Sequence, residues 1–270
     1  MGEEMRRRYR TPTEESFPNR LSILLGEEEI VYEKAMSLRY GENPHQPAAL
    51  YRPLRGEMVI GNLKLIKGGK GGLSQTNIED VNSAINILKY FDEPACAVMK
   101  HLNPSGVAAS RGGGEKLKDI YIRARDCDSL AAYGSIVVFN STLDEETGEE
   151  IASTFVEVVA APSFEEGAIR TLSRKRDLRI MQIGNLGSLS KFIGDPPRPY
   201  TISILLDGSI ILSTPLLTRI RGPEDLRIVT TRTPTERELD DLIFSWYICM
   251  NVRSNGVVVS RERTTLGIGV

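Results

Sequence analysis

Short apolar runs rich in β-branched residues alternate along this chain with segments that open on helix-capping residues. The clearest runs are PACAVMKH, YGSIVVFN, FVEVVAAP and DLRIMQI, each of which ends at a turn or a polar cluster. Runs of this length and composition predict buried strands. Their alternation with helical segments predicts an α/β layered domain, in which polar residues at the strand ends are candidates for chemistry.

Three helix starts are predicted from capping boxes, in which a hydroxyl residue precedes a carboxylate by three positions. The pairs are Thr76 with Glu79, Ser163 with Glu166, and Thr235 with Glu238. After the first pair, apolar side chains recur at helical spacing and leave the opposite face polar. These residues are Ile78, Val81, Ile85 and Leu88. We expect this stripe to pack on the sheet.

Glycine, proline and polar residues accumulate between Gly184 and Tyr200 and predict an internal boundary. We therefore expect a flexible tail over residues 1–16, a first unit over 17–190 and a second over 191–270. The elements expected in the second unit are a hairpin in YTISILLDGSIILSTP, a strand in LRIVTT, a helix from Thr235 to about Met250, and a β pair in GVVVSRERTTLGIG.

Charge and cysteine content narrow the classes of partner. The 34 basic and 36 acidic residues give a formal net charge of -2, so no general attraction to nucleic acid or to an anionic membrane is expected. The chain has no apolar run of membrane-spanning length and no signal peptide pattern. Its three cysteines form no CxxC motif, which favours a reducing cytoplasm.

Lys100 and His101 end a predicted strand and precede NPSG, a turn sequence, so both side chains are expected at the sheet edge. A neutral imidazole can take a proton from an amine, while a neighbouring ammonium stabilises negative charge on an acyl oxygen. The pair therefore suits acyl or formyl transfer. The alternative is a surface lysine beside a histidine that bonds only a turn carbonyl.

The second histidine, His45, lies in LRYGENPHQ, downstream of Arg39 and Tyr40. This stretch is either a structural loop or, with Arg39 as a phosphate fork, half of a nucleotide pocket. A zinc deaminase site is excluded, because the chain has neither His-x-Glu nor Pro-Cys-x-x-Cys. The glycine runs KGGKGG and GGG match no phosphate-binding motif and are predicted to be loops.

Seven stretches in order resemble the transformylase domain of the bifunctional purine biosynthesis enzymes, from about Phe17 to Val270. They are FPNRLSI, LRYGENPHQPAALY, KHLNPSGVA, YGSIVVFN, FVEVVAAPSFEEGA, LIFSWYICMNVRSNGVVV and TLGIG. The resemblance implies formyl transfer from 10-formyltetrahydrofolate to the 5-amino group of aminoimidazole carboxamide ribonucleotide (AICAR). It also implies a three-layer α/β/α fold of duplicated cytidine-deaminase-like units without zinc, the second incomplete, and a homodimer.

By the same resemblance, His101 is the general base, Lys100 stabilises the oxyanion and Asn255 contacts the substrate near His101. The nucleotide pocket is expected to contain Arg39, Tyr40, His45, Asn103, Gly134 and Glu157. No metal is implied.

The chain differs from the family pattern at both ends. No cyclohydrolase region precedes the match, so no IMP cyclohydrolase activity is expected, and TLGIGV stops where the family continues toward folate-site residues. We therefore expect this chain alone to bind the nucleotide better than the folate and to turn over little. The leading hypothesis is an enzyme of this family, active alone or when completed by a separate chain. The alternatives are a non-catalytic nucleotide-binding remnant and a fragment of a longer enzyme.

Overall fold

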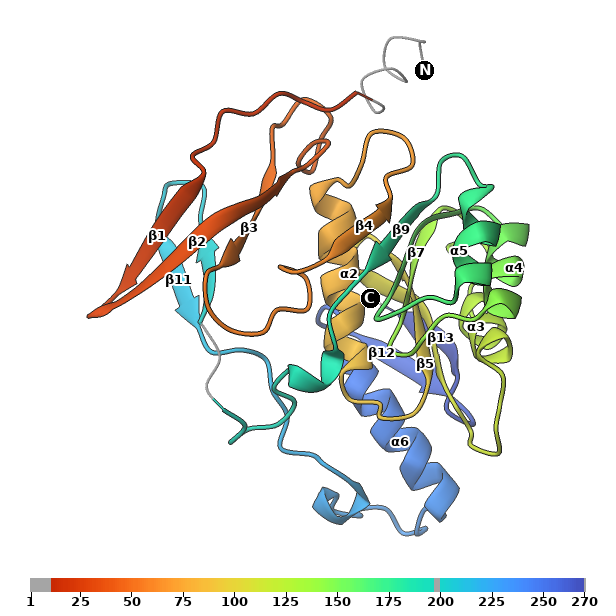
Figure 1. The fold of residues 1–270 in the computed structure, drawn as a ribbon. Coiled ribbons are helices and arrows are strands. Elements are labelled where there is room, and N and C mark those ends of the chain that lie inside the picture. The colour runs from red at the N-terminus through yellow and green to blue at the C-terminus, as the bar shows by residue number, and fades with distance from the viewer. Residues whose placement is uncertain (1–10, 197–199, 270) are drawn as a thin grey trace.

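A mixed six-stranded sheet forms the centre of the computed structural model, which describes residues 11–196 and 200–269 (Figure 1). Its strand order is β4-β9-β8-β7-β5-β6. The strands are β4 (Lys64–Lys67), β5 (Ala95–Lys100), β6 (Asn103–Ala109), β7 (Ser135–Phe139), β8 (Val156–Ala161) and β9 (Arg179–Gln182). β7, β8 and β9 are parallel, whereas β5 runs antiparallel to both of its neighbours.

Helices cover both faces of this sheet. One face is covered by α2 (Gln75–Leu88), and the other by α3 (Leu117–Asp126), α4 (Glu145–Ser153) and α5 (Glu166–Ser173) (Figure 1). Alternate residues of β5 divide between the two cores, with Ala97 and Met99 facing α2, and Cys96 and Val98 facing α3. This part of the chain has the three layers that the resemblance implied.

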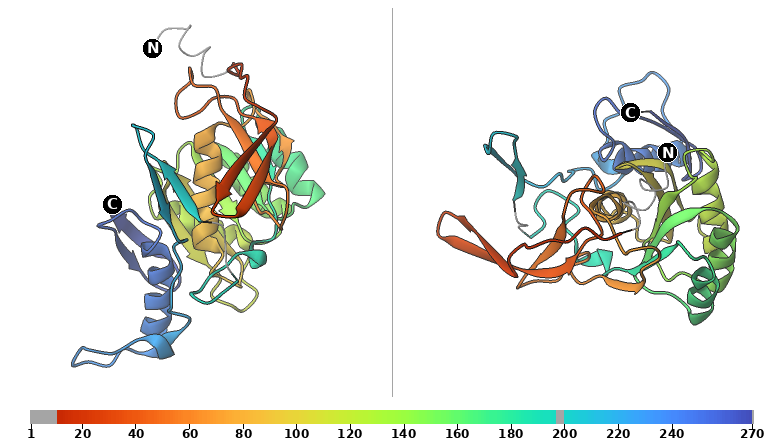
Figure 2. Two further views of the ribbon diagram at one scale, coloured as in Figure 1. Left: turned by 90° about the vertical axis from the view of Figure 1, so that its left-hand side faces the viewer. Right: turned by 90° about the horizontal axis from the view of Figure 1, so that it is seen from above.

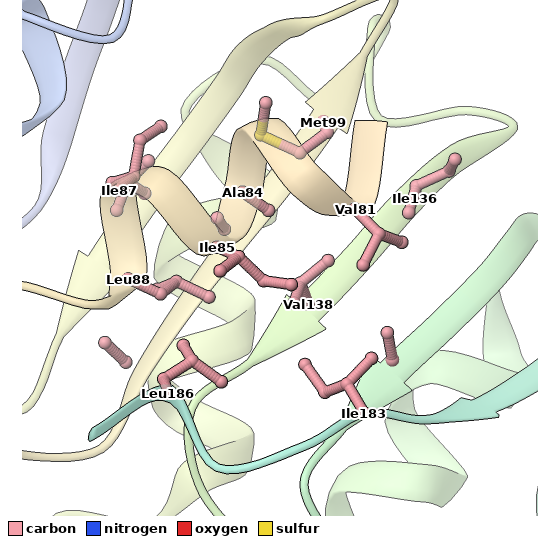
Figure 3. Close-up of a cluster of buried hydrophobic side chains, with 14 of the residues drawn as sticks. Val81, Ala84, Ile85, Ile87, Leu88, Met99, Ile136, Val138, Ile183 and Leu186 are labelled. Carbon is pink, nitrogen blue, oxygen red and sulfur yellow. The ribbon is translucent and has the colours of Figure 1, made fainter. Parts of the chain in front are cut away.

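The apolar stripe of α2 packs on the sheet as predicted. Val81 and Leu88 are fully buried, and Ile85 is 3 % exposed. Figure 3 shows this face directed at Ile136 and Val138 of the sheet and at Ile183 and Leu186 beyond it. Since burying one such side chain stabilises the fold by roughly 1.5–3 kcal/mol, the stripe fixes α2 firmly in place.

Two of the three predicted capping boxes are wrong in position. The first helix starts two residues earlier than expected, because Ser74 accepts from the amide of Asn77 and forms the box with that residue. The helix predicted at Ser163 begins at Glu166, and the Ser163 hydroxyl pairs with Thr142 instead. The third box, Thr235 with Glu238, is confirmed. A capping pattern identifies a helix start, but competing side chains decide the residue.

The four predicted sheet strands are confirmed, but LRIVTT is not a strand. These residues form exposed coil between η2 (Pro223–Asp225) and α6 (Glu236–Cys249). β-branched residues favour a strand only where a partner edge and a packing surface are present. The glycine run at residues 67–72 ends β4 and continues as a turn, as expected for a loop.

An antiparallel sheet near the N-terminus was not predicted. It consists of β1 (Arg20–Leu25), β2 (Glu28–Ser37) and β3 (Ala49–Pro53). Residues 1–10 of the expected tail lie outside the described residues. Thr13 donates its amide to the carbonyl of Arg39 at 2.7 Å, and Glu15 pairs with Lys34 at 2.7 Å. The chain is therefore bonded to β2 before β1 begins.

The expected hairpin, helix and β pair after residue 200 are confirmed. They are β10 (Thr201–Ile204) with β11 (Ile210–Ser213), α6, and β12 (Val257–Ser260) with β13 (Thr265–Gly269); η1 (Leu186–Ser188) precedes them. Figure 2 shows the β10–β11 and β1–β2 hairpins projecting on the side away from α3–α5. The expected boundary at 190 stays a prediction, and residues 197–199 lie outside the described part.

α6 joins the core on the α2 side of the sheet. Its Tyr247 ring stacks on Tyr90 with the centroids 4.4 Å apart, and its Phe244 ring lies 5.4 Å from that of Phe91. β13 begins beside β6, where the Thr265 hydroxyl bonds both the amide and the carbonyl of Val107. β13 is thereby attached to β6 at the edge of the central sheet. Within residues 11–196 and 200–269, no helix has both the length and the apolar character needed to cross a membrane.

The close approach of α3 to β6 depends on Gly106. A Cβ atom at this position would lie 1.9 Å from the Ala124 carbonyl oxygen and 2.8 Å from Cβ of Cys127. Because the neighbouring atoms belong to a packed helix, we predict that Gly106→Ala lowers the free energy of unfolding by about 1–3 kcal/mol. Urea denaturation measures this loss. Gly267→Ala is the control, since a Cβ atom there meets nothing within 4 Å; equal losses would contradict the prediction.

Candidate functional site

The Lys-His pair lies at a tight hairpin turn between β5 and β6. His101 and Leu102 have φ angles of 52° and 70°, and Lys100 pairs with Asn103 across the turn. Two consecutive positive φ angles are the pattern of a type I′ hairpin, which normally uses Asn and Gly. NPSG was predicted to be the turn, but the chain reverses before it, at His101 and Leu102, so NPSG begins β6. Pro104 is accommodated in the strand because it lies beside a β-bulge.

Asp80 holds this turn from the second turn of α2. The Leu102 amide donates to its carboxylate at 2.5 Å, and the His101 amide bonds the same group. Burial raises the pKa of Asp80, and the two amide hydrogen bonds and the nearby His101 only partly oppose this effect. Sequence reasoning missed Asp80, although an acidic residue on the apolar side of a predicted helix is a detectable signal. The His101 side chain is exposed.

Lys100 and Gly134 are brought together. The Lys100 ammonium donates to the carbonyls of Tyr133 and Gly134 at 3.1 and 2.9 Å. A Cβ atom at Gly134, where φ is 68°, would lie 3.3 Å from the Lys100 nitrogen, so a side chain would crowd the ammonium. An imidazole, which the following residue supplies, can move a proton, and a fixed ammonium can stabilise developing negative charge.

The position of the pair on the sheet differs from expectation. Ligands of open α/β sheets usually bind beyond the carboxyl ends of the parallel strands. Lys100 lies instead beside Gly134, which immediately precedes β7, because β5 runs antiparallel to β7. The pair therefore occupies the amino-terminal edge of the parallel strands.

Exposed apolar side chains lie on and around the segment whose carbonyls bind Lys100. The rings of Tyr133 and Phe155 have centroids 4.9 Å apart and are 69 % and 41 % exposed, and Leu130 is 89 % exposed. A soluble protein rarely leaves such residues open together without a ligand or partner to cover them. Sequence reasoning did not identify these three residues as part of a site, because none of them lies on a periodic apolar face.

Arg39 and Tyr40 form a second cluster, at the amino end of α2. The Arg39 guanidinium is stacked on the Tyr40 ring at 4.5 Å and donates to the Tyr40 hydroxyl and to the Lys70 carbonyl. Its Nε atom is buried without a hydrogen-bond partner. A hollow of about 350 Å³ borders this arginine and is also lined by Thr13, Glu14 and Gly71. A buried guanidinium with an unused donor can still bind an anion.

Arg179 is a further member of this cluster that sequence reasoning missed. It is 4 % exposed and donates to the carbonyls of Lys70 and Gly72 in the glycine loop. Glu157, expected in the nucleotide pocket, lies 4.0 Å from it. Burial lowers the pKa of Arg179, and the charge of Arg39 lowers it further. Two buried guanidinium groups thus share one carbonyl, and the Glu157 carboxylate lies at the edge of ion-pair distance from Arg179.

The two clusters are linked by α2. The Gln75 amide donates to the Tyr40 carbonyl, and Asp80, five residues further on, binds the His101 turn. At 1.5 Å of rise per residue these two attachment points are about 7.5 Å apart along the helix axis. The cluster of Arg39 and Tyr40 and the Lys-His pair are therefore attached to the same half of one helix.

The remaining candidates lie outside the two clusters or at the edge of the His101 turn. His45 is exposed on the loop before β3, and Asn255 is exposed and accepts from the Ser254 hydroxyl at 3.0 Å. Asn103 pairs with Lys100 across the turn, and its Nδ2 atom donates to the His101 carbonyl at 3.4 Å. Its buried Oδ1 atom has no hydrogen-bond partner. Register brings Asn255 toward the His101 end of β6, since β13 starts beside Ala108 and β12 pairs antiparallel with β13.

In the part of the chain that the structure describes, no three His, Cys, Asp or Glu side chains are grouped to hold a metal ion. The side chains gathered here are an exposed imidazole, an ammonium held by two carbonyls, and two buried guanidinium groups.

Comparison with known proteins identifies the family. The sequence model of the AICARFT/IMPCHase bienzyme matches residues 6–270. Bifunctional purine biosynthesis protein PurH of Caldicellulosiruptor saccharolyticus is 37 % identical over 260 residues, covering 95 % of this chain and 46 % of that protein. The PurH proteins of Acetivibrio thermocellus and Oceanobacillus iheyensis are 35 % and 33 % identical, with 95 % and 97 % of this chain and 46 % and 47 % of theirs covered. This chain, which spans about half the length of these relatives, belongs to the AICARFT/IMPCHase family of purine biosynthesis proteins.

Proposed function

We propose that this chain carries the formyl-transfer site for the reaction of 10-formyltetrahydrofolate with the 5-amino group of AICAR. The observation that carries the proposal is the Lys100-His101 pair, presented at a left-handed turn and with its ammonium fixed by two carbonyls. The family assignment supports the same chemistry. The alternative is a nucleotide-binding chain that does no chemistry alone and acts, if at all, as one subunit of a split enzyme.

In the proposed reaction, the amine nitrogen attacks the formyl carbon and the carbonyl oxygen becomes an oxyanion. His101 accepts the proton that the amine loses, and Lys100 stabilises the oxyanion through the ammonium proton not directed at Tyr133 or Gly134. The oxyanion then re-forms the carbonyl as the bond from carbon to the folate nitrogen breaks, which leaves the formyl group on the amine nitrogen. His101 returns its proton to that nitrogen, so tetrahydrofolate leaves neutral at this atom and the imidazole is regenerated.

The arginine cluster is the proposed site of the nucleotide phosphate. Its excess of buried positive charge and the unused Nε donor of Arg39 favour an anion. Tyr40, Glu157 and His45 are proposed to contact the rest of the nucleotide, and Asn103 and Asn255 to contact it near His101. The linkage through α2 supports this order, because the cluster and the base lie on the same half of the helix.

The exposed rings of Tyr133 and Phe155 are the proposed contact for the folate. They adjoin the carbonyls that hold Lys100, so a planar ring system placed on them lies next to the proposed oxyanion site. No metal is needed for this scheme, since the proton acceptor and the positive charge are side chains.

We further propose that the protein acts in the cytoplasm as a homodimer of duplicated cytidine-deaminase-like units. The order helix, strand, two-residue turn, strand supports the duplication, because it occurs as α2-β5-β6 and again as α6-β12-β13. The exposed β10–β11 hairpin, with Leu206, Ile210 and Ile211 open to solvent, supports an assembly that covers it. A separate chain that completes the folate site remains part of the proposal.

His101→Asn tests the proposed base without disturbing the turn, since Asn adopts positive φ angles readily. We expect the rate of formyl transfer to fall by about 10²–10⁴-fold, with thermal stability close to that of the parent. The assay follows tetrahydrofolate formation by the protein containing this chain, supplied with its partner chain where one is required. Undiminished activity would remove His101 from the mechanism, and nucleotide binding without any turnover by the parent would favour the non-catalytic alternative.

Arg39→Lys tests the proposed phosphate site. A lysine ammonium keeps the charge but cannot form the paired hydrogen bonds of a guanidinium, so we expect nucleotide affinity to fall about tenfold. Calorimetric titration with AICAR nucleotide measures the change. Arg125→Lys is the matched control, because Arg125 lies on α3 and binds Glu150. Equal nucleotide affinity in the Arg39 variant and the parent would return Arg39 to a structural role.

A further inference from the structure

The turn that presents His101 is unfavourable by sequence. Its two central residues are His and Leu, neither of which adopts a positive φ as easily as Gly, Asn or Asp. Non-glycine residues in this region cost roughly 1–3 kcal/mol each and persist only where their surroundings hold them. The surroundings that hold this turn include the Asp80 carboxylate, 6 % exposed, which accepts from the amides of both residues.

We propose that Asp80 is a positioning residue for formyl transfer, which fixes the direction of the His101 imidazole by binding the backbone amides of His101 and Leu102. This inference rests on the proposed function. Asp80 acts through the backbone only and contacts no reacting atom in this scheme. Its effect is on the fraction of molecules in which the imidazole lies where the amine proton leaves.

The ionised carboxylate is well suited to this task. A carboxylate can accept hydrogen bonds at both of its oxygens, whereas the Asn side chain has one acceptor oxygen and an NH₂ group that would face an amide N–H. Ionising a buried carboxyl group costs stability, however, and here burial outweighs the two amide hydrogen bonds. A neutral side chain at this position would stabilise the fold more than an ionised one. We therefore infer that the charge of Asp80 serves to hold the His101 turn.

The same device occurs a second time in this chain. Asp241 is the sixth residue of α6, as Asp80 is of α2, and it accepts from the amides of Glu262 and Arg263 at 2.9 and 2.8 Å. These residues have φ angles of 52° and 54°. Asp241 and Glu262 each follow their counterparts Asp80 and His101 by 161 positions.

What differs is the side chain that each turn presents. The position of His101 is taken in the second turn by Glu262, which pairs with Arg111 and Arg237 on the surface. The carboxylate on the helix therefore holds a left-handed turn in both places, and the residue at the first turn position decides its use. Asp241 is accordingly the matched control for Asp80.

We predict that Asp80→Asn lowers kcat for formyl transfer by about 10- to 100-fold, because a small displacement of a catalytic group carries a penalty of this size. KM for the AICAR nucleotide stays near that of the parent, since the arginine cluster is unchanged. Asp241→Asn leaves kcat near the parent value. Steady-state kinetics on the complete protein measure both variants. A change in KM alone, or equal loss of kcat in the two variants, would overturn the positioning role.

Stability should change in the opposite direction to rate. Because the pKa of Asp80 is raised on folding above the ordinary aspartate value of 3.8, its neutral form stabilises the fold and this contribution is lost as pH rises through the folded pKa. Glu79 and His101 are the charged neighbours of this carboxyl. Relative to Asp80→Asn, the parent should lose stability as pH rises above about 4. Denaturation of both proteins at acid and neutral pH measures the difference; a parent that gains stability relative to the variant would contradict it.

Hydrogen exchange separates failure of this inference from failure of the proposed function. The Leu102 amide should exchange faster in Asp80→Asn than in the parent, whether or not the parent transfers formyl groups. If exchange is faster in the variant but the parent is inactive, formyl transfer is refuted, whereas the conclusion that Asp80 holds the turn stands. Unchanged exchange with an active parent refutes the role of Asp80 alone.

Discussion

Both candidate clusters depend on the packing of one helix. The apolar side of α2 is buried against the sheet through Val81, Ile85 and Leu88, and this burial leaves the helix no freedom to rotate. The rest of the helix is then used for attachment, at Gln75 for the segment carrying Arg39 and Tyr40, and at Asp80 for the His101 turn. Hydrophobic burial fixes the helix, and the hydrogen bonds at Gln75 and Asp80 fix the two clusters relative to the helix.

Charge at the site is compensated unevenly. The guanidinium groups of Arg39 and Arg179 are both buried, and the charge of Arg39 lowers the pKa of Arg179, yet Glu157 is at the limit of ion-pair distance from Arg179. The loop carbonyl of Lys70 accepts from both arginines. Carbonyl dipoles satisfy hydrogen bonds without cancelling net charge, so the two guanidinium charges are not neutralised by the loop. The glycine loop supports this cluster through its carbonyl groups, which hold the two arginines.

The reversal of β5 relocates the chemistry. A parallel β5 would end at the opposite edge of the sheet from Gly134, and Lys100 would have no carbonyls there to bind. The antiparallel direction places Lys100 beside the segment that precedes β7 and beside the exposed rings of Tyr133 and Phe155. One hairpin of two residues thereby brings the ammonium, the imidazole and an apolar surface to the same edge.

Local sequence sufficed for the elements whose periodicity or capping is strong. The buried runs at β5, β7, β8 and β9, the stripe of α2 and the capping box of α6 are all properties of neighbouring residues, and the structure contains each of them. The motifs around Lys100, His101 and Arg39 were also visible, because unusual residues at the ends of such runs stand out. The prediction of a strand in LRIVTT was wrong, because β propensity is a local property and cannot supply a partner strand.

Tertiary structure decided what these residues do to one another. Nothing near His101 in the sequence indicates that its turn is left-handed, because the supporting carboxylate of Asp80 comes from 21 positions earlier, on another element. Arg179 joins Arg39 across 140 positions, and the carbonyls that hold Lys100 lie more than 30 positions away. Hydrogen bonds and buried charges depend on distance in space, so they form only after apolar burial has placed the elements; the sequence determined which elements and reactive groups exist, and the packed fold determined their pairing.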